Sequence, residues 1–197
     1  MDSMVSLENY QFVDLILGKE KETHWPKSFG DSVNQVQFRT VPTKLQHIIR
    51  EYCNRGGNLF LSGSYVGADL FSHPKEDSAS IKYARKVLHF DWSTGHASRS
   101  GVVFSANSSL LPRNKELSFN VDLRSDIYTV ESPDAIIPIE GSEQLLRYSE
   151  NQFGAAVGYR KSYGLVVMGF PFETIIDPAL RTELMRGVLR YLKIPNN

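Results

Sequence analysis

One short segment of the sequence has the spacing of a catalytic turn. After an apolar segment the chain reads Gly63, Ser64, Tyr65, Val66 and Gly67. In hydrolases, a glycine–x–nucleophile–x–glycine segment after a strand holds the reactive side chain on a sharp strand-to-helix turn. Here the nucleophile position is occupied by tyrosine, whose ordinary pKa of about 10 leaves it neutral unless a base lies beside it. The spacing therefore predicts the turn and leaves its chemistry open.

Three interpretations of this turn follow from its residues. In the first, the glycines only permit a tight turn, and Tyr65 packs across it. In the second, the turn binds a ligand, because the N–H groups at the start of the following helix, together with the Ser64 hydroxyl, could hold a carboxylate or a sugar hydroxyl. In the third, Tyr65 is a nucleophile, and His96 reaches it as a base from a loop distant in sequence.

Two carboxylates and two tryptophans add to these candidates. Asp69 and Glu173 converge if their strands are neighbours, and glycoside hydrolysis needs such a pair. Each could instead be an acidic residue in the first turn of a helix, where the helix dipole favours it. Trp25 and Trp92 offer flat apolar faces on which a sugar could stack, or they pack in a loop and in the core. The catalytic candidates are thus Tyr65, Glu173, Asp69 and His96, and the ligand-binding candidates are Ser64, Tyr65 and Trp25.

The composition excludes several other classes of function. The 197 residues carry 22 Lys and Arg against 22 Asp and Glu, so no basic excess points to nucleic acid or to an anionic membrane. The five histidines are scattered and form no metal-binding motif, and we expect neither a metal nor another cofactor. Cys53 is the single cysteine, which rules out a disulfide framework within the chain.

The sequence also lacks membrane and export signals. No apolar segment approaches the roughly 20 residues that a membrane-spanning helix needs, so we expect no membrane insertion. The first residues have neither a basic region nor an apolar core, as a signal peptide would. Because the first strand signal comes almost at once, we interpret residues 1–197 as one domain, a fragment or module of a longer chain that carries any export signal elsewhere.

The elements expected before the turn are those of a parallel unit. The segment 10–18 is almost continuously apolar, as a buried strand is. A helix is predicted from Pro42, because Leu45, Ile48, Ile49 and Tyr52 have helical spacing, and Gly56 and Gly57 end it. The apolar segment 58–63 is a second buried strand. A strand, a crossover helix and a strand of this type predict a right-handed parallel unit.

The second half of the chain predicts antiparallel strands followed by a helix. The alternation of apolar and polar residues over 117–123 indicates a strand with one wet face. Segments within 144–170 indicate a meander of strands, and the last of these strands, which is wholly apolar, should return to the centre of the sheet. Asp177 and Pro178 begin a C-terminal helix. The expected fold class is α/β, with a mostly parallel, flavodoxin-like central sheet flanked by helices and an antiparallel meander before the last core strand.

The order of these features resembles the class I glutamine amidotransferase-like fold. The resemblance rests on the strand, the turn at Tyr65, the meander, and the ending Phe170-Pro171-Phe172-Glu173 after a buried strand. In that family the turn carries a cysteine nucleophile, and the later segment a histidine base and a glutamate that orients it. In this chain Tyr65 takes the place of the cysteine and no histidine precedes Pro171, whereas Glu173 matches the glutamate. The resemblance therefore implies a degenerate site.

A closer resemblance is to domains of secreted Bacteroidetes proteins labelled xanthan lyase or fibronectin type III domain protein. It spans Phe12 to about Leu192 and rests on segments such as "FVDLILGKEKET", "PDAIIP" and "RYSENQFGAAVGY". It implies a non-catalytic module, structural or ligand-binding, within an exported polysaccharide-processing protein that is extracellular or periplasmic. The alternative is a carbohydrate-active lyase or hydrolase, or an amidase, with a non-standard site around Tyr65 and Glu173. Implied partners are other domains of the parent chain, a carbohydrate ligand and a second copy of the chain.

Overall fold

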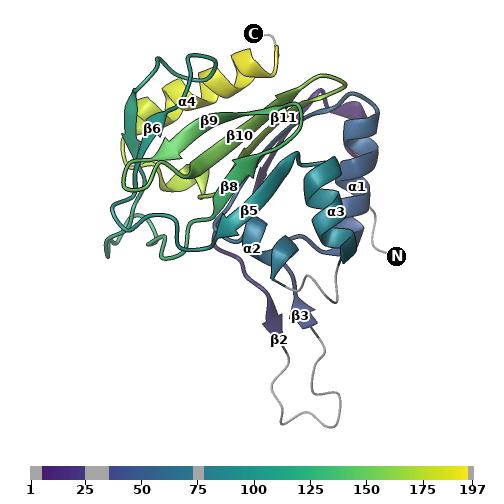
Figure 1. Ribbon diagram of the computed structural model, residues 1–197, viewed down its shortest axis with the longest axis horizontal. Coiled ribbons are helices and arrows are strands. Elements are labelled where there is room, and N and C mark those ends of the chain that lie inside the picture. Colours follow the sequence, from purple (N-terminus) through teal and green to yellow (C-terminus); the bar gives the residue numbers. More distant parts are fainter. Residues whose placement is uncertain (1–5, 25–35, 73–77, 195–197) are drawn as a thin grey trace.

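The structure is a computed structural model that describes residues 6–24, 36–72 and 78–194. Its main feature is a seven-stranded sheet with the strand order β1-β4-β11-β10-β9-β6-β7 (Figure 1). Its strands, in that order, are Phe12–Ile16, Asn58–Ser62, Gly164–Met168, Gly154–Arg160, Ser142–Tyr148, Val102–Ser105 and Glu116–Ser118.

The remaining strands form two small sheets, and helices pack around them. The small sheets pair β2 (Thr23–His24) with β3 (Val36–Phe38) and β5 (Phe90–Thr94) with β8 (Ala135–Pro138). The helices are η1 (Leu7–Asn9), α1 (Thr43–Asn54), α2 (Val66–Phe71), α3 (Ser78–Lys86), η2 (Phe172–Thr174) and α4 (Pro178–Tyr191).

The predicted fold class is wrong. Only β1, β4 and β11 run parallel to one another, and β10, β9, β6 and β7 continue the sheet with antiparallel pairings. The molecule is a curled, mixed and β-rich sheet, not a parallel flavodoxin-like α/β fold. The reason is that the segments interpreted as a meander beside the main sheet supply more of its strands than the parallel unit does.

Several of the individual elements were nevertheless predicted correctly. The helix after Pro42, the buried strand 58–62 and the C-terminal helix are all present. Asp177 caps α4 by accepting a hydrogen bond from the backbone N–H of Ala179 at 2.8 Å. The last apolar strand, β11, lies between β4 and β10, as expected of a strand that returns to the centre.

Each face of the sheet has its own core. In β4, Phe60 points to one face, where α4 contributes Leu184 and Val188, whereas Leu59 and Leu61 point to the other. This alternation is the ordinary consequence of the strand's two-residue period. The second face is covered by α1, α2 and α3, which Figure 1 shows gathered together and apart from α4. Among the described residues, no helix combines the length and apolar character that crossing a membrane requires, in agreement with the sequence.

Candidate functional site

The turn at Tyr65 connects β4 to α2 as the spacing predicts. Ser62 ends the strand, and α2 begins at Val66 with Tyr65 as its N-cap residue. The backbone N–H of Ser64 donates to the carbonyl of Gly18, at 2.9 Å, which ties the turn to the end of β1. Ser64 is buried and Tyr65 is half-buried. No hydrogen bond joins the Tyr65 hydroxyl to any other residue that the structure describes.

The helix start that could have held an external anion is filled by the protein's own Asp134. Its carboxylate accepts hydrogen bonds from the backbone N–H groups of Gly67, at 2.7 Å, and Ala68, at 3.2 Å. The indole Nε1 of Trp92 donates to it at 2.7 Å. Burial raises the pKa of Asp134 well above its ordinary value, and these hydrogen bonds act in the opposite direction. Trp92 therefore orients an internal carboxylate. The N–H groups of Gly67 and Ala68, which the predicted ligand would have needed, are already bonded to Asp134.

Asp69 also serves the fold. Its buried carboxylate accepts hydrogen bonds from the backbone N–H groups of Thr40 and Val41, both at 3.1 Å, and lies 3.5 Å from the guanidinium of Arg39. These contacts fix the segment that leads into α1 against α2. Burial, the largest effect, raises the pKa of Asp69, and Arg39 opposes it. The hydrogen bonds and the ion pair of this carboxylate therefore stabilise the fold.

Glu173 lies at a different place, beyond the end of β11. One of its carboxylate oxygens accepts a hydrogen bond from the hydroxyl of Tyr128, and the other is buried without a hydrogen-bond partner. The Asp14 residue is exposed as a whole, but partial burial of its carboxyl group and, second, the charge of Glu173 raise the pKa of Asp14 to about 6. A Cβ atom on Gly18 would lie 3.7 Å from Glu173 Oε1, so the glutamate adjoins the turn to which Ser64 bonds.

The structure therefore brings together only part of the predicted site. Gly18 is the common neighbour of two of the candidates, since its carbonyl accepts from the Ser64 backbone N–H and a Cβ atom on it would lie 3.7 Å from Glu173 Oε1. The hydroxyls of Ser62 and Ser64 and Glu173 Oε2 are each buried without a hydrogen-bond partner. His96 is exposed, and its Nδ1 lies 3.3 Å from the Ser132 hydroxyl.

No hydrogen bond joins any two of the four catalytic candidates Tyr65, Asp69, His96 and Glu173, all of which the structure describes. Tyr65 has no hydrogen-bonded base among the described residues, and the two carboxylates have separate partners: Thr40 and Val41 for Asp69, and Tyr128 for Glu173. Trp25, the remaining ligand-binding candidate, lies outside the described residues.

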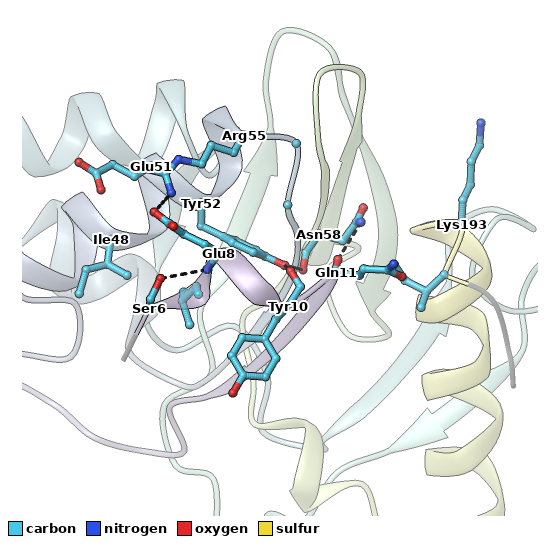
Figure 2. Close-up of a pocket in the computed structure, with 14 residues that line it drawn as sticks. Ser6, Glu8, Tyr10, Gln11, Ile48, Glu51, Tyr52, Arg55, Asn58 and Lys193 are labelled. Atoms are coloured by element: carbon cyan, nitrogen blue, oxygen red, sulfur yellow. Dashed lines mark hydrogen bonds and ion pairs between the residues drawn. The ribbon is translucent and has the colours of Figure 1, made fainter. Parts of the chain in front are cut away.

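A hollow of about 460 Å³ lies at the opposite end of the parallel strands (Figure 2). It is formed by η1, by the C-terminal end of α1, by the starts of β1 and β4, and by the residues that follow α4. Its lining combines aromatic rings, carboxamides and charged groups: Ser6, Leu7, Glu8, Tyr10, Gln11, Ile48, Glu51, Tyr52, Arg55, Gly56, Gly57, Asn58, Lys193 and Ile194. Its volume falls within the usual range of small-molecule sites.

Tyr52 organises this hollow. Figure 2 shows its side chain between the Glu8–Arg55 ion pair and the carboxamides of Gln11 and Asn58. The Tyr52 hydroxyl lies 3.1 Å from the carbonyl oxygens of both Tyr10 and Asn58, and Asn58 Nδ2 donates to the carbonyl of Gln11 at 3.0 Å. The starts of the two strands are thereby fixed to each other and to the last turns of α1.

The groups that remain available to a ligand are of two kinds. Tyr10 is 56% exposed and offers a flat aromatic face. Gln11, Glu51 and Lys193 are exposed as well, and their side chains make no hydrogen bond or ion pair within the described part of the chain. Figure 2 shows these groups spread along the hollow, with Glu51 and Lys193 at its opposite ends and the Tyr10 ring pointing away from both. Such a lining offers an aromatic face and separate polar groups to a molecule with both apolar and hydroxyl-rich surfaces.

A second hollow, of about 520 Å³, adjoins Glu173. It is lined by Arg124, Ser125, Asp126, Ile127, Tyr128, Glu173 and Arg181. The Arg181 guanidinium donates to the carbonyl oxygen of Glu173 at 2.8 Å, and Arg124 is paired with Asp126 at 3.0 Å. Its cationic side chains are therefore already engaged. Within the described ranges, no group of three or more His, Cys, Asp and Glu side chains could hold a metal ion.

The sequence reasoning did not single out Tyr10, Gln11 or Asn58. A usable signal was present: an aromatic residue and a carboxamide directly precede the first buried strand, and Asn58 opens the next. Because neighbouring parallel strands begin at the same edge of a sheet, polar residues before two such strands meet there. The predicted site lay instead at the carboxyl ends of the strands, because ligands of open α/β sheets usually bind there.

Comparison with known proteins corrects the family assignment. No known protein family matches the sequence, and no curated protein is significantly similar to it. One solved structure with a similar fold is the "mmIFT52 N-terminal domain", with a TM-score of 0.51 and 10% identity over 79% of this chain and 73% of that one. The resemblance to an amidotransferase-like domain is therefore wrong, and nothing supports the xanthan lyase label that accompanied it. At this identity the likeness concerns the fold alone.

Proposed function

We propose that this chain is a non-catalytic binding module that takes a carbohydrate in the hollow around Tyr52. The observation that carries the proposal is the exposed ring of Tyr10, which lines a hollow of about 460 Å³ together with unpaired polar side chains. Sugar rings have apolar C–H faces that stack on aromatic rings, and hydroxyl edges that carboxamides and carboxylates can bind. Gln11 and Glu51 supply such groups at this site.

We propose a non-catalytic module because each candidate catalytic group has its own separate partner. Asp69 holds the segment before α1, His96 contacts Ser132, and Asp134 takes the donors at the start of α2. A general base must come within hydrogen-bond reach of the group it activates, and none stands beside Tyr65 in the described residues. The alternative of a lyase, hydrolase or amidase at Tyr65 and Glu173 has no observation that favours it.

The test is binding of the purified chain to a panel of neutral, acidic and amino-sugar polysaccharides, by affinity electrophoresis and then calorimetry. Tyr10→Ala should weaken binding of a retained polysaccharide about tenfold or more, which corresponds to about 1.4 kcal/mol. Tyr10→Phe keeps the ring and should retain most of the affinity. Phe153→Ala removes another exposed ring, at the turn between β9 and β10, and should leave binding unchanged.

Two results would contradict the proposal. One is binding that survives Tyr10→Ala and Gln11→Ala together, because the ligand would then lie elsewhere. The other is turnover of a polysaccharide or amide substrate that Tyr65→Phe or Glu173→Gln abolishes. The placement of the module in an exported protein, outside the cell or in the periplasm, stays a prediction, and fractionation of cells that express the full parent chain tests it.

A further inference from the structure

The helix α4 and the residues after it carry a local excess of positive charge. Residues 178–194 contain four cationic side chains, Arg181, Arg186, Arg190 and Lys193, and a single acidic one, Glu183. The whole chain has 22 cationic and 22 acidic side chains and no net charge, so this excess belongs to one region of the surface. A local patch of this kind attracts anions even when the net charge of the protein is zero.

Three of these cations form a row that leads into the hollow around Tyr52. Arg186 and Arg190 are four residues apart and therefore lie on one side of α4. The backbone N–H of Lys193 donates to the carbonyl of Arg190 at 3.0 Å, which keeps Lys193 within one turn of it. All three residues are exposed, and Lys193 lines the hollow. The row therefore extends from the hollow along the surface of α4.

The acidic side chains next to this row already have partners. The Glu183 carboxylate lies 3.9 Å from the ammonium group of Lys115, which belongs to the segment before β7. Glu143, on β9, accepts a hydrogen bond from the hydroxyl of Tyr191 at 2.9 Å. The three cations of the row, in contrast, have no ion pair within the described part of the chain. Their charge is therefore available to a ligand.

The charges of the hollow are separated in the same sense. Arg55 is paired with Glu8, so Lys193 and Glu51 are the charged groups of the lining that remain without a partner among the described residues. Figure 2 shows Lys193 and Glu51 at opposite ends of the hollow. The Lys193 end therefore favours an anionic group, and the row on α4 continues from this same end.

The length of the row favours a polymer over a single small anion. At 1.5 Å per residue, the helical path from Arg186 to Lys193 covers about 10 Å. Neighbouring cations are three or four residues apart, about 5–6 Å along the helix, which is less than the screening length of about 8 Å in physiological salt. They therefore act together on one ligand, and a polymer with repeated anionic groups can contact all of them at once.

We propose that the ligand of the hollow is an anionic polysaccharide, whose acidic groups lie along Lys193, Arg190 and Arg186. This inference rests on the proposed function, since it names the kind of carbohydrate that the same hollow binds. The attraction comes from the row alone, because the chain as a whole is neutral. Binding should therefore depend on the charge of the sugar polymer and on salt.

The test compares polygalacturonate and alginate with their methyl-esterified forms, which keep the sugar chain and remove its charge. Affinity electrophoresis of the purified chain at neutral pH identifies a retained polymer, and calorimetry then gives its dissociation constant. The chain should bind an acidic form about tenfold or more tightly than its ester. An increase in NaCl from about 50 mM to about 500 mM should weaken binding of the acidic form about tenfold and leave binding of the ester nearly unchanged.

Substitutions separate the row from the overall charge of the chain. Arg186→Gln combined with Lys193→Gln should weaken binding of the acidic polymer about five- to tenfold, as expected for the loss of two exposed ion pairs. The matched control, Lys82→Gln with Lys86→Gln, removes the same charge from α3, which Figure 1 shows apart from α4, and should leave binding unchanged. Lys193→Arg keeps the cation and should retain most of the affinity.

The inference and the proposed function fail in different ways. If a neutral ester binds as tightly as its acid, or in its place, and Tyr10→Ala weakens that binding, the hollow takes a carbohydrate without selecting an anion, and only this inference is wrong. If an acidic polymer binds with the expected salt dependence but Tyr10→Ala has no effect, the ligand lies outside the hollow, and both are wrong. Polyglutamate that binds as tightly as polygalacturonate would also contradict the inference, because the surface would then recognise charge without sugar.

Discussion

A Cβ atom on Gly57 would lie 2.4 Å from Cζ of Tyr52, so the tyrosine ring occupies the space that any larger residue would need. The preceding Gly56 has a φ of +85° and ends α1 in the left-handed conformation that glycine favours. The two adjacent glycines thus have separate tasks. Gly56 turns the chain out of the helix, and Gly57 makes room for the ring at the centre of the hollow.

We predict that Gly57→Ala destabilises the protein by about 1–3 kcal/mol, the usual cost of forcing extra atoms into a packed site. The substitution should also lower the affinity of the hollow for any ligand, because the Tyr52 ring must shift. Urea unfolding measures the first effect and calorimetry the second. Gly95→Ala is the control, because its added Cβ would find its nearest neighbour at 3.7 Å, an ordinary contact. Equal effects of the two substitutions would contradict the role assigned to Gly57.

Asp14 should give the stability a pH dependence. Its pKa is about 6 in the folded chain against an ordinary value of 3.8, so the folded state holds the proton more tightly. The stabilisation is fully present below about pH 4 and is lost as the pH rises through about 6. Since the residue is exposed, solvent screening should keep the effect below about 1 kcal/mol. Urea unfolding of the unmodified chain and of Asp14→Asn from pH 4 to pH 8 measures this effect. The protein concentration should be low enough to keep the chain monomeric.

The sign of this effect is diagnostic. The unmodified chain should lose stability relative to Asp14→Asn as the pH rises, and a difference that grows in the opposite direction would show that the carboxylate is stabilised in the folded state. Glu173→Gln removes the neighbouring negative charge and should lower the pKa of Asp14, which carboxyl-carbon NMR titration can follow.

Asp69→Asn should destabilise the chain by about 2–3 kcal/mol, because the substitution removes a buried charge and places an amide where two backbone N–H groups need acceptors. Asp126→Asn is a suitable control. Asp126 is ion-paired with Arg124 at the fully exposed surface, where solvent screening leaves such a pair little effect on stability. Thermal unfolding of both variants measures the difference. A stable Asp69→Asn chain would reopen a functional role for this acid.

Removal of two tyrosine hydroxyls should separate a turn residue from a core residue. Tyr65→Phe should change stability by less than about 0.5 kcal/mol, since its hydroxyl has no hydrogen-bond partner in the described residues. Tyr148→Phe should cost about 1–2 kcal/mol, because its buried hydroxyl donates to the carbonyl of Asp134 at 2.8 Å. Urea unfolding of both variants tests the pair, and a large loss from Tyr65→Phe would indicate a contact at that hydroxyl.

Local signals predicted the elements well and their assembly less well. The apolar stripe of α1, the glycines after it and the cap of α4 each act within a few residues, so the sequence displays them directly. The pairing of β10 with β9 and of β9 with β6 depends on contacts distant in sequence. These pairings made the sheet mostly antiparallel, and no local pattern weighs them against the parallel unit.

The strand predicted over 117–123 shows how a local pattern can mislead. The structure ends β7 at Ser118. Beyond it, the buried side chain of Asn120 donates hydrogen bonds to the carbonyls of Asp122, Ile127 and Tyr128, at 2.9–3.2 Å, and closes a loop. An asparagine that bonds to backbone groups competes with the sheet for them. The alternation of apolar and polar residues therefore extends to Leu123, although the strand itself ends at Ser118.

The position of Asp134 has a consequence for any anion that approaches the start of α2. That carboxylate belongs to the same chain, and its backbone is anchored by hydrogen bonds to Gly169 and Tyr148. An anion from solution would therefore compete with an intramolecular acceptor. The effective concentration of that acceptor is fixed by the fold and does not depend on the concentration of any solute. Asp134 thus acts as a built-in ligand of the N–H groups at the start of α2. An external anion could reach these N–H groups only if the segment that carries Asp134 moved away.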